Sequence, residues 1–245
     1  MIIDFHFHLV EPLETIKSIM AKYSIEKIVG IPLPNNLEFG MCGKSDEYRF
    51  NVLKRLLNTS TEIGIKYKDD NIIFAELASA TERNSPFAVV GNIIKFIPVI
   101  DHFRYNLYYF DLISAISSKP QNIVMIHTGW GSKVDRLGMV IKEFPEKTFV
   151  LAHMKEDDDE YNEDRKFMLD KFPNVYVEMS YLSSPKRLAQ YVQMGFEDRI
   201  LFGSDFRTMA DEPTLQWMID AVNVAQISQE QKEKILYKNA KKLLN

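Results

Sequence analysis

Short apolar runs rich in β-branched residues alternate along this chain with longer segments whose apolar positions recur at helical spacing. The runs predict strands, and most are apolar at nearly every position, which is typical of parallel strands covered on both faces. The expected strands are residues 1–8, 26–31, 71–78, 92–99, 122–127, 147–152, 174–179 and 199–204. The expected helices are residues 11–22, 45–66, 84–90, 105–118, 133–143, 160–171, 184–194, 213–225 and 228–243.

This alternation predicts a closed (β/α)8 TIM barrel of the α/β class, a fold that takes roughly 250 residues. The chain has 245 residues, so we expect a single domain over 1–245. A doubly wound open sheet is the alternative, but that fold usually carries a glycine-rich phosphate loop after its first strand. Residues 8–12 read His-Leu-Val-Glu-Pro and contain no glycine, which favours the barrel.

Two stretches interrupt the alternation. Residues 32–44 are long for a connection between a strand and a helix, and they are rich in Pro, Asn and Gly. In a barrel this loop lies over the active face, so it is either a lid on the site or a surface excursion. Residues 156–160 are five consecutive acids, and such runs are usually solvated loops.

The composition narrows the class of protein. Hydrophobic residues make up 46% of the chain, which is enough for a sizeable core. A net charge of −4 argues against nucleic acid as a partner, because nucleic-acid binders usually carry a basic face. The single cysteine, Cys42, can form no internal disulfide, which is typical of a reducing compartment. Since neither a membrane-spanning run nor a signal peptide is visible, we expect a cytoplasmic protein that contacts no membrane.

The candidate chemistry lies at the ends of the expected strands. His6 and His8 are two residues apart in the first strand, so their side chains share one face. His127 and His153 each end a later apolar run. Asp205 follows the last run, and we interpret it as the only carboxylate that ends an apolar strand. A barrel enzyme builds its active site from side chains at the C-terminal ends of several strands.

Each of these residues also has a structural interpretation. A single histidine in an apolar run is commonly a hydrogen-bonded core residue, and Gly-Ser-Asp205 is commonly a turn or a helix cap. Their joint occurrence at four strand ends favours a metal site. A hydrolytic zinc needs about three protein ligands and an open position for water. His6 and His8 supply two ligands, and His127 and Asp205 supply a third and a fourth.

Five motifs in chain order carry a resemblance to a known family. They are Ile3–His8 (IDFHFH), Ile126–Gly129 (IHTG), Leu151–His153 (LAH), Leu201–Phe206 (LFGSDF) and the tail Ile235–Ala240 (ILYKNA). This ordered set resembles the amidohydrolase superfamily. The match is closest to its amidohydrolase 2 branch, which also contains metal-dependent decarboxylases.

The resemblance implies roles for the candidate residues. His6, His8, His127 and Asp205 would hold one divalent metal, with Zn as the first expectation and Mn or another divalent ion as the alternative. Asp205 would also accept a proton from the attacking water, and His153 would be a catalytic imidazole or lie just behind the metal ligands. Asp4 lies on the same face of the first strand as His6 and His8. We interpret it as a buried carboxylate that is hydrogen-bonded to the backbone or to another inner group.

Other branches of the superfamily fit less well. Binuclear members bridge two metals with a carbamylated lysine on strand four, where Lys95 stands, but we favour an unmodified lysine and one metal. A TatD-type nuclease would carry a glutamate in a strand-four motif, whereas residues 91–95 read Gly-Asn-Ile-Ile-Lys. A PHP-type phosphoesterase would end in Asp-x-His, whereas Asp205 is followed by Phe206 and Arg207.

Candidate substrate-binding residues follow the same strands. Trp130 comes soon after the fifth strand and would wall the pocket, although a core position is equally consistent with it. His102, Arg104 and Arg207 follow strands four and eight and would bind a substrate carboxylate or phosphate, although each alone is also typical of a surface charge.

Aromatic residues gather at near-helical spacing in one segment. These are Phe103, Tyr105, Tyr108, Tyr109 and Phe110. We interpret the segment first as core and second as the contact face of a homodimer.

Three functions remain open. The leading prediction is a metal-dependent hydrolase that acts on an amide, lactone or ester of a small molecule. The first alternative is a metal-dependent, non-oxidative decarboxylase of a small aromatic acid, which would need cationic groups at the mouth. The second alternative is a metal-binding barrel without catalysis.

Overall fold

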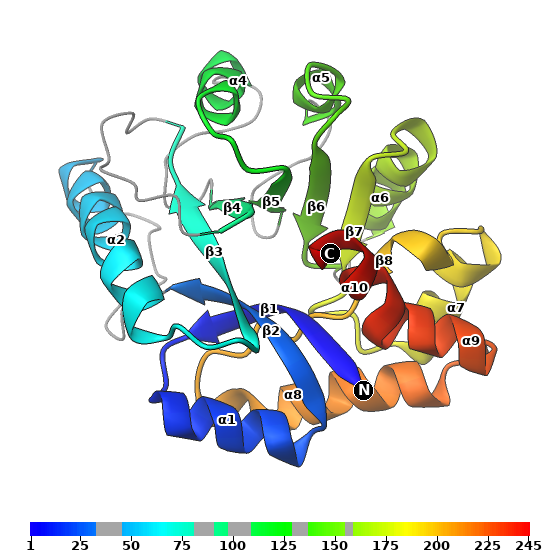
Figure 1. The fold of residues 1–245 in the computed structure, drawn as a ribbon. Coiled ribbons are helices and arrows are strands. Elements are labelled where there is room, and N and C mark those ends of the chain that lie inside the picture. Colours follow the sequence, from blue (N-terminus) through cyan, green and yellow to red (C-terminus); the bar gives the residue numbers. More distant parts are fainter. Residues whose placement is uncertain (33–45, 81–90, 98–108, 129–136, 155–158) are drawn as a thin grey trace.

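The computed structural model describes residues 1–32, 46–80, 91–97, 109–128, 137–154 and 159–245. Eight parallel strands form one sheet in the order β1 to β8, and helices surround it (Figure 1). Each strand therefore pairs with its neighbours in the sequence, as in a TIM barrel. The predicted fold class is confirmed.

The strands agree closely with the predicted runs. They are β1 (Ile2–Leu9), β2 (Ile25–Pro32), β3 (Ile72–Ala78), β4 (Ile93–Phe96), β5 (Ile123–His127), β6 (Thr148–Ala152), β7 (Val175–Glu178) and β8 (Ile200–Leu201).

The helices of the described residues lie between these strands or follow the last one. The α-helices are α1 (Leu13–Lys22), α2 (Asp46–Lys66), α4 (Tyr109–Ser117), α5 (Leu137–Lys142), α6 (Asp159–Lys171), α7 (Pro185–Gln193), α8 (Glu212–Val224), α9 (Gln229–Glu233) and α10 (Asn239–Leu244). Two short 3-10 turns are η1 (Glu197–Arg199) and η2 (Met209–Asp211), and η3 (Lys234–Lys238) is a π-helical turn.

The barrel closes through the segment that follows β8. Only residues 200–201 of the predicted strand 199–204 are regular strand, but the chain beyond them runs beside β1. Three backbone hydrogen bonds join the two segments: Phe5 N to Phe202 O at 2.9 Å, Asp205 N to His6 O at 2.8 Å, and His8 N to Phe206 O at 2.8 Å. The amide of Phe202 instead donates to Ile235 O at 3.0 Å. The closing strand is shorter than predicted because part of its hydrogen bonding goes to the C-terminal helix.

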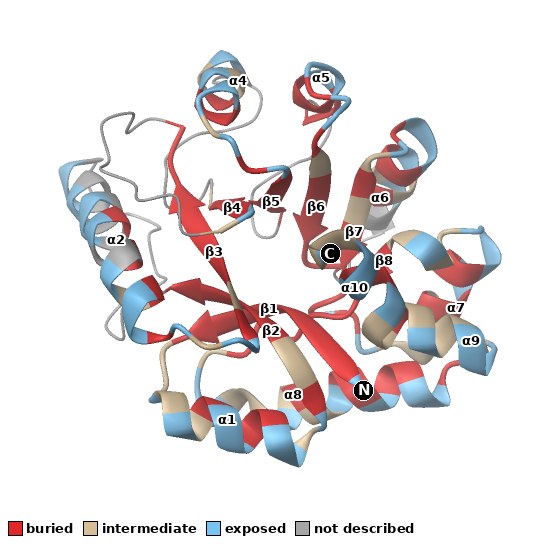
Figure 2. Cartoon of the chain, viewed as in Figure 1, coloured by how far each residue is buried: buried red, intermediate tan, exposed pale blue. Residues whose placement is uncertain are grey.

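In the part of the chain that the structure describes, two apolar clusters hold the barrel together. The larger one joins strand residues to residues of α1, α4 and α8. The smaller one includes Ile93 and Met125, which by the two-residue period of a strand share a face with Lys95 and His127. Figure 2 shows that the strands are buried along almost their whole length, whereas the helices expose their outer sides. The candidate site therefore rests on a layer of packed side chains.

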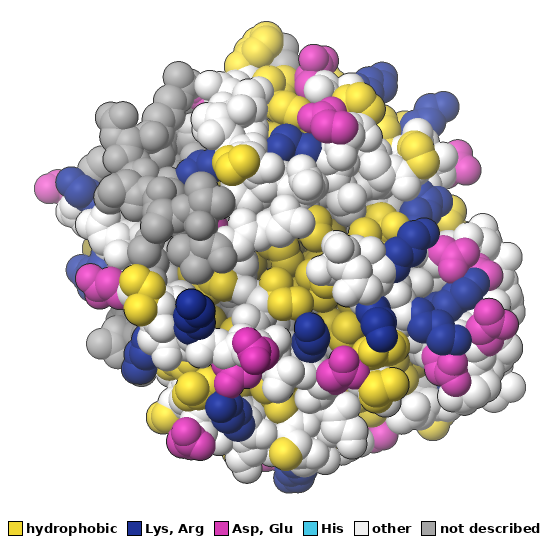
Figure 3. Space-filling model, viewed as in Figure 1, with side chains coloured by type: hydrophobic (Ala, Val, Ile, Leu, Met, Phe, Trp, Pro, Cys, Tyr) yellow, Lys and Arg dark blue, Asp and Glu magenta, His cyan; other side chains and the backbone are white. Residues whose placement is uncertain are grey.

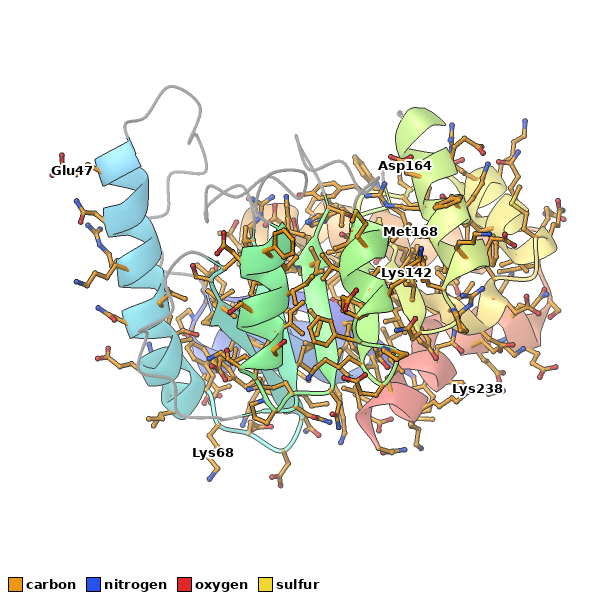
Figure 4. All side chains as sticks on the ribbon, turned by 90° about the horizontal axis from the view of Figure 1, so that it is seen from above. Glu47, Lys68, Lys142, Asp164, Met168 and Lys238 are labelled. Carbon is orange, nitrogen blue, oxygen red and sulfur yellow. The ribbon has the colours of Figure 1, made fainter. Side chains whose placement is uncertain are left out.

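The C-terminal helix closes one end of the barrel. Ala240 of α10 belongs to the smaller cluster, and Leu243 and Leu244 pack against it. Lys238, just before α10, lies at the end of the barrel opposite Asp164, which is near the start of α6 (Figure 4). Because α6 follows the C-terminal end of β6, α10 covers the N-terminal end of the barrel. The opposite end is where barrel enzymes carry their active sites.

Asn239 ties this helix to the strand that closes the barrel. The predicted helix 228–243 is interrupted by η3, and Asn239 follows that turn. Its amide Nδ2 donates to Glu197 O at 2.7 Å and to Ile200 O at 2.8 Å. Glu197 belongs to η1, just before β8, and Ile200 is the first residue of β8, so one side chain holds the strand in place.

We expect Asn239→Ala to lower stability by about 1–3 kcal/mol, because a buried hydrogen-bonded amide is lost and two carbonyls lose a donor. In a chain of this size that corresponds to a fall in melting temperature of roughly 2–4 °C per kcal/mol. Thermal unfolding followed by circular dichroism measures the shift. Asn51→Ala, at an exposed position of α2, is the matched control and should unfold like the parent protein. Equal melting temperatures for both variants would contradict the role of Asn239.

The remaining predictions concern the surface and three segments of the chain. Charged side chains of both signs are interspersed over the face shown in Figure 3. Among the described residues, the longest and most apolar helices still fall short of what a membrane crossing needs. Pro32, the first residue of the predicted loop 32–44, ends β2, and the rest of that loop lies outside the described residues, as do the predicted helix 84–90 and most of the acidic run 156–160.

The aromatic segment before the fifth strand is described only in part. Phe110, at the start of α4, is 69% exposed, so the core interpretation is wrong for this residue. The helix turns it outward, away from the face that carries the buried Leu112 and Ile116. Phe103, Tyr105 and Tyr108 lie outside the described residues.

Candidate active site

Among the described residues, seven ionisable side chains from six strands converge at the C-terminal end of the barrel. They are His6 and His8 of β1, Lys95 of β4, His127 at the end of β5, His153 just after β6, Glu178 at the end of β7 and Asp205 after β8. All except His127 are classed as buried, and His127 is partly buried. Residues up to 199 positions apart in the chain are thus brought into one site by the closure of the barrel.

The first group combines the two strand-one histidines with the last aspartate. Asp205 Oδ1 lies 3.0 Å from His6 Nε2 and 2.8 Å from His8 Nε2. One ligand atom from each of the three residues falls within a common span of 4.8 Å, which is the arrangement that a bound metal ion requires. The structure therefore brings together three of the four predicted metal ligands.

A second group was not foreseen. Glu178 Oε2 lies 2.7 Å from His6 Nδ1, and with His153 these residues form a second set whose ligand atoms lie within 4.8 Å. The interpretation of Asp205 as the only carboxylate that ends an apolar strand is wrong. Glu178 ends the strand Val-Tyr-Val-Glu in the same way. Because the apolar Met179 follows it, the sequence does not show that the strand ends at Glu178.

His127 reaches the site through His153. The Nδ1 atom of His127 is 2.7 Å from His153 Nε2, and His153 Nδ1 is 2.7 Å from Ser180 Oγ. Ser180 Oγ in turn donates to Glu178 Oε2 at 2.9 Å. His127 belongs to neither of the groups found among the described residues, so its role as a metal ligand stays a prediction. The catalytic role of His153 also stays a prediction.

Tyr181 and Arg207 lie on the outer side of Asp205. Tyr181 OH donates to Asp205 Oδ2 at 2.6 Å, and Arg207 Nη2 donates to Tyr181 OH at 3.1 Å. The Arg207 guanidinium is also 3.7 Å from Asp205 Oδ2. Arg207 is thus beside the site, as predicted, whereas His102, Arg104 and Trp130 lie outside the described residues.

Burial controls the charge of the site. It lowers the pKa of His8 and of His127 to about 3, and it holds the pKa of His153 well below its ordinary value. Burial opposes the ionised form of Asp205, but the contacts with His6 and His8 outweigh it and keep the pKa of Asp205 well below its ordinary value. At neutral pH these three imidazoles are neutral and the carboxylate is charged.

His6 and Lys95 are coupled. Burial and Lys95 both lower the pKa of His6, but Asp205 and Glu178 outweigh them and raise it overall. Burial lowers the pKa of Lys95 to about 8, and Lys95 Nζ lies 2.5 Å from His6 Nε2. Lys95 therefore lies in the site, next to a candidate ligand. That Lys95 is unmodified stays a prediction.

Comparison with known families identifies the chain. A family model described as amidohydrolase matches residues 119–245, which is more than half of the chain. The chain belongs to the amidohydrolase family. Within the superfamily its place is the amidohydrolase 2 branch, in agreement with the resemblance of its motifs. A search of curated proteins found no significant match.

Solved structures of similar proteins share the fold. An uncharacterised TIM-barrel protein of Bordetella bronchiseptica has 18% identity and a TM-score of 0.66 over 99% of this chain and 98% of that one. A 5-carboxyvanillate decarboxylase of Sphingomonas paucimobilis has 10% identity and a TM-score of 0.65 over 99% and 98%. A probable 2-pyrone-4,6-dicarboxylic acid hydrolase of Acinetobacter baumannii has 14% identity and a TM-score of 0.60 over 99% and 98%. At these identities the likeness establishes the barrel and not the reaction.

The donor set of this amidohydrolase fits a divalent metal. Neutral imidazole and ionised carboxylate are the forms that bind a metal, and His8 and Asp205 have those forms at neutral pH. Two atoms bound to a tetrahedral zinc at about 2.0–2.1 Å lie about 3.3 Å apart. The two contacts of Asp205 Oδ1, with His6 Nε2 and His8 Nε2, are close to this spacing at 3.0 and 2.8 Å. Imidazole and carboxylate ligands suit zinc and several other divalent ions.

Three site residues have unusual backbone conformations. His153, Tyr181 and Asp205 each follow a strand end directly or within a few residues, and their φ angles are 71°, 64° and 54°. Non-glycine residues adopt this left-handed region rarely, at a cost on the order of 1–3 kcal/mol each. Among the described residues Ser24 is the only other non-glycine example. Strain concentrated at three neighbouring strand ends is typical of a functional site.

Asp4 links the two strands that close the barrel. Its carboxylate accepts hydrogen bonds from Ser204 Oγ at 2.6 Å, from Ser204 N at 3.1 Å and from His6 N at 3.0 Å. Burial raises the pKa of Asp4 to about 7. These contacts agree with the predicted structural role, because Asp4 binds the backbone amides of His6 and of Ser204, the residue before Asp205.

Proposed function

We propose that this amidohydrolase is a metal-dependent hydrolase that cleaves an amide, lactone or ester of a small molecule. The observation that carries the proposal is the double environment of Asp205. Its Oδ1 atom faces the Nε2 atoms of His6 and His8, whereas its Oδ2 atom faces Tyr181 and Arg207. In the proposed reaction Oδ1 binds the metal and Oδ2 exchanges a proton with the attacking water and the leaving group.

Each site residue has its own role in the proposed hydrolysis. His6, His8 and Asp205, together with His127, would hold the metal, which when bound polarises a carbonyl and makes water more acidic. Asp205 accepts the proton of the attacking water and delivers it to the leaving group as the scissile bond breaks. Tyr181 donates to Asp205 Oδ2 and so fixes the direction in which this oxygen can take the proton. His153 supports the site through its contact with His127.

A decarboxylase is the second candidate, and Arg207 favours it. The guanidinium is partly exposed beside the site, where it would bind a substrate carboxylate through charge-assisted hydrogen bonds. In that reaction the C–C bond to the carboxylate breaks, CO2 leaves, and a proton is added to the substrate carbon. One protein of similar fold is described as a 5-carboxyvanillate decarboxylase.

Metal analysis and a substrate screen test the proposal together. We expect about one divalent ion per chain, with Zn as the first expectation, and turnover of at least one lactone, ester or amide. Turnover of aromatic carboxylic acids alone, with release of CO2, would replace the leading proposal with the second candidate. Bound metal without turnover on either panel would favour a non-catalytic metal-binding barrel.

Arg207→Met should act on KM. For a substrate that carries a carboxylate, we expect KM to rise about 10–100-fold, which is the loss of roughly 1.5–3 kcal/mol for a hydrogen bond to a charged group. For an uncharged substrate the change should be much smaller. Steady-state kinetics on both kinds of substrate measure the difference, and Arg55→Met, at an exposed position of α2, is the matched control. An equal effect on both kinds of substrate would exclude Arg207 as a carboxylate ligand.

A further inference from the structure

Glu178 lies at the centre of the hydrogen bonds that join the site histidines. The side chain is fully buried. Its Oε2 atom is 2.7 Å from His6 Nδ1, 2.9 Å from Ser180 Oγ and 3.3 Å from the backbone amide of His153. Its Oε1 atom accepts from the backbone amide of Ser180 at 2.5 Å. A carboxylate only accepts hydrogen bonds, so every one of these partners must present a proton to it.

The first consequence concerns His6. Glu178 requires a proton on His6 Nδ1. The other ring nitrogen, Nε2, faces Lys95 Nζ at 2.5 Å and Asp205 Oδ1 at 3.0 Å. The Lys95 ammonium would donate a hydrogen bond to Nε2, whereas the Asp205 carboxylate would accept one from it. Glu178 therefore excludes the one neutral form of the ring that has its proton on Nε2 alone. A neutral His6 keeps Nε2 as its unprotonated nitrogen, which is the atom that faces Asp205 in the first metal group.

The second consequence passes through Ser180 to two further histidines. Ser180 Oγ donates its single proton to Glu178, so it can only accept from His153 Nδ1, 2.7 Å away. A neutral His153 then has no proton on Nε2, and this atom must accept from His127 Nδ1, 2.7 Å away. A neutral His127 in turn keeps Nε2 unprotonated. One carboxylate thereby determines which ring nitrogen carries the proton in the three histidines.

The backbone of Gly203 leaves room for the carboxylate of Glu178. A Cβ atom placed on Gly203 would lie 2.2 Å from Glu178 Oε1, so only glycine allows the carboxylate to sit where it does. Gly203 is two residues before Asp205, in the segment that closes the barrel. The closing segment therefore carries both the aspartate and the space that the glutamate occupies.

We propose that Glu178 is a positioning residue that sets the proton positions of His6, His153 and His127, so that His6 and His127 present unprotonated Nε2 atoms to a metal. The inference rests on the proposed metal site. A metal-binding histidine commonly donates its other N–H to a carboxylate, and loss of such a partner typically costs 10–100-fold in metal affinity. Glu178 does this directly for His6 and indirectly for His127.

Zinc affinity of the metal-free protein, measured by competition with a chromophoric chelator, is the first test. We expect Glu178→Gln to weaken zinc binding about 10–100-fold, because an amide cannot accept all four hydrogen bonds. Gly203→Ala should weaken zinc binding in the same direction, since it displaces Glu178 without removing a polar group. Glu76→Gln is the matched control, because Glu76 is a buried strand carboxylate that contacts Lys119 and Gln121 and no histidine. Its zinc affinity should equal that of the parent protein.

Nitrogen-15 chemical shifts of the histidine rings, measured in the metal-free protein, are the second test and need neither metal nor activity. In the parent protein each neutral ring of His6, His127 and His153 should carry its proton on Nδ1. Ser180→Ala should disturb this order at His153 and His127 and leave His6 unchanged, whereas Glu178→Gln should disturb all three. A structural role alone would not separate the rings in this way.

The outcomes are distinct. If Glu178→Gln binds zinc like the parent protein, or if His6 carries its proton on Nε2, the inference is wrong. If the parent chain binds two zinc ions and Glu178→Gln binds one, Glu178 is itself a ligand of a second ion and the inference is also wrong. If the parent protein binds no metal but shows the predicted ring protons, the inference about proton order holds and the proposed function fails.

Discussion

Asp205→Asn should nearly abolish turnover while leaving the barrel folded. A positioned acid or base contributes roughly 10²–10⁴-fold to a rate, and asparagine keeps the size of the side chain but cannot take a proton. Metal binding should weaken less than turnover does, because the amide oxygen can still act as a ligand. The expected result is a fall in kcat of at least about 10²-fold with metal fully loaded. Steady-state kinetics at saturating metal measure it.

The contacts of Asp205 sharpen this test. Tyr181→Phe removes the hydrogen bond to Oδ2 but leaves both contacts of Oδ1, so it should lower kcat by less than Asp205→Asn does and should keep the metal. Asp170→Asn, at an exposed position of α6, is the matched control and should be fully active. Near-normal turnover and metal content in Asp205→Asn would show that this residue only caps a turn. The proposed hydrolase would then have no proton acceptor.

The fold could be predicted from the sequence because its signals are local. Each strand is a short apolar run bounded by polar residues, and the helical spacing between the runs leaves a barrel as the simplest closed arrangement. The exceptions are set by distant contacts. Strand β8 is shorter than predicted because Phe202 donates to Ile235, and the last helix is interrupted by a π turn where that carbonyl is used. This hydrogen bond joins residues 33 positions apart and leaves no mark on the local pattern.

The candidate site was predictable where it depends on residues at strand ends, and not where it depends on the register of two strands. His6, His8, His153 and Asp205 lie at strand ends, and the alternation of strands and helices is sufficient to bring strand ends together. Tyr181 contacts Asp205 only because β7 and β8 are aligned with Glu178 opposite Leu201. That register brings the two following turns side by side, and it depends on packing rather than on any motif.

Glu178 shows a different limit of sequence analysis. Its position at the end of β7 carries the same signal as Asp205, but no neighbouring glycine or polar residue marks the end of the run. Its role depends on four donors that the fold brings to it, and on the absence of a side chain at Gly203, 25 positions away. A carboxylate in an apolar strand is costly to bury unless it is hydrogen-bonded. A carboxylate at the end of an apolar strand therefore indicates a functional site as strongly as a histidine there does.

The second large effect is expected at the strand-one histidines. We expect His8→Ala to lower metal affinity by more than the roughly 10–100-fold that loss of an outer partner costs, because a ligand itself is removed. The folded state should change little. Among the described residues the His8 side chain has one polar partner, Asp205, and its Nδ1 atom has none. Metal analysis after exchange into metal-free buffer measures the affinity, and thermal unfolding of the metal-free protein measures stability.

His6→Ala should lose the metal to a similar degree but should also destabilise the metal-free protein. His6 contacts Glu178, Lys95 and Asp205, so its removal takes a partner from three buried charged groups and the cost should be about 3–5 kcal/mol. Each variant therefore serves as the control for the other. Both should lose the metal to a similar degree, but only His6→Ala should lower the stability of the metal-free protein. If both retain full metal occupancy, the chelate on β1 is wrong. If they lose the metal and are equally stable, the buried network around His6 does not support the fold, and Glu178 is held by Ser180 and the His153 backbone alone.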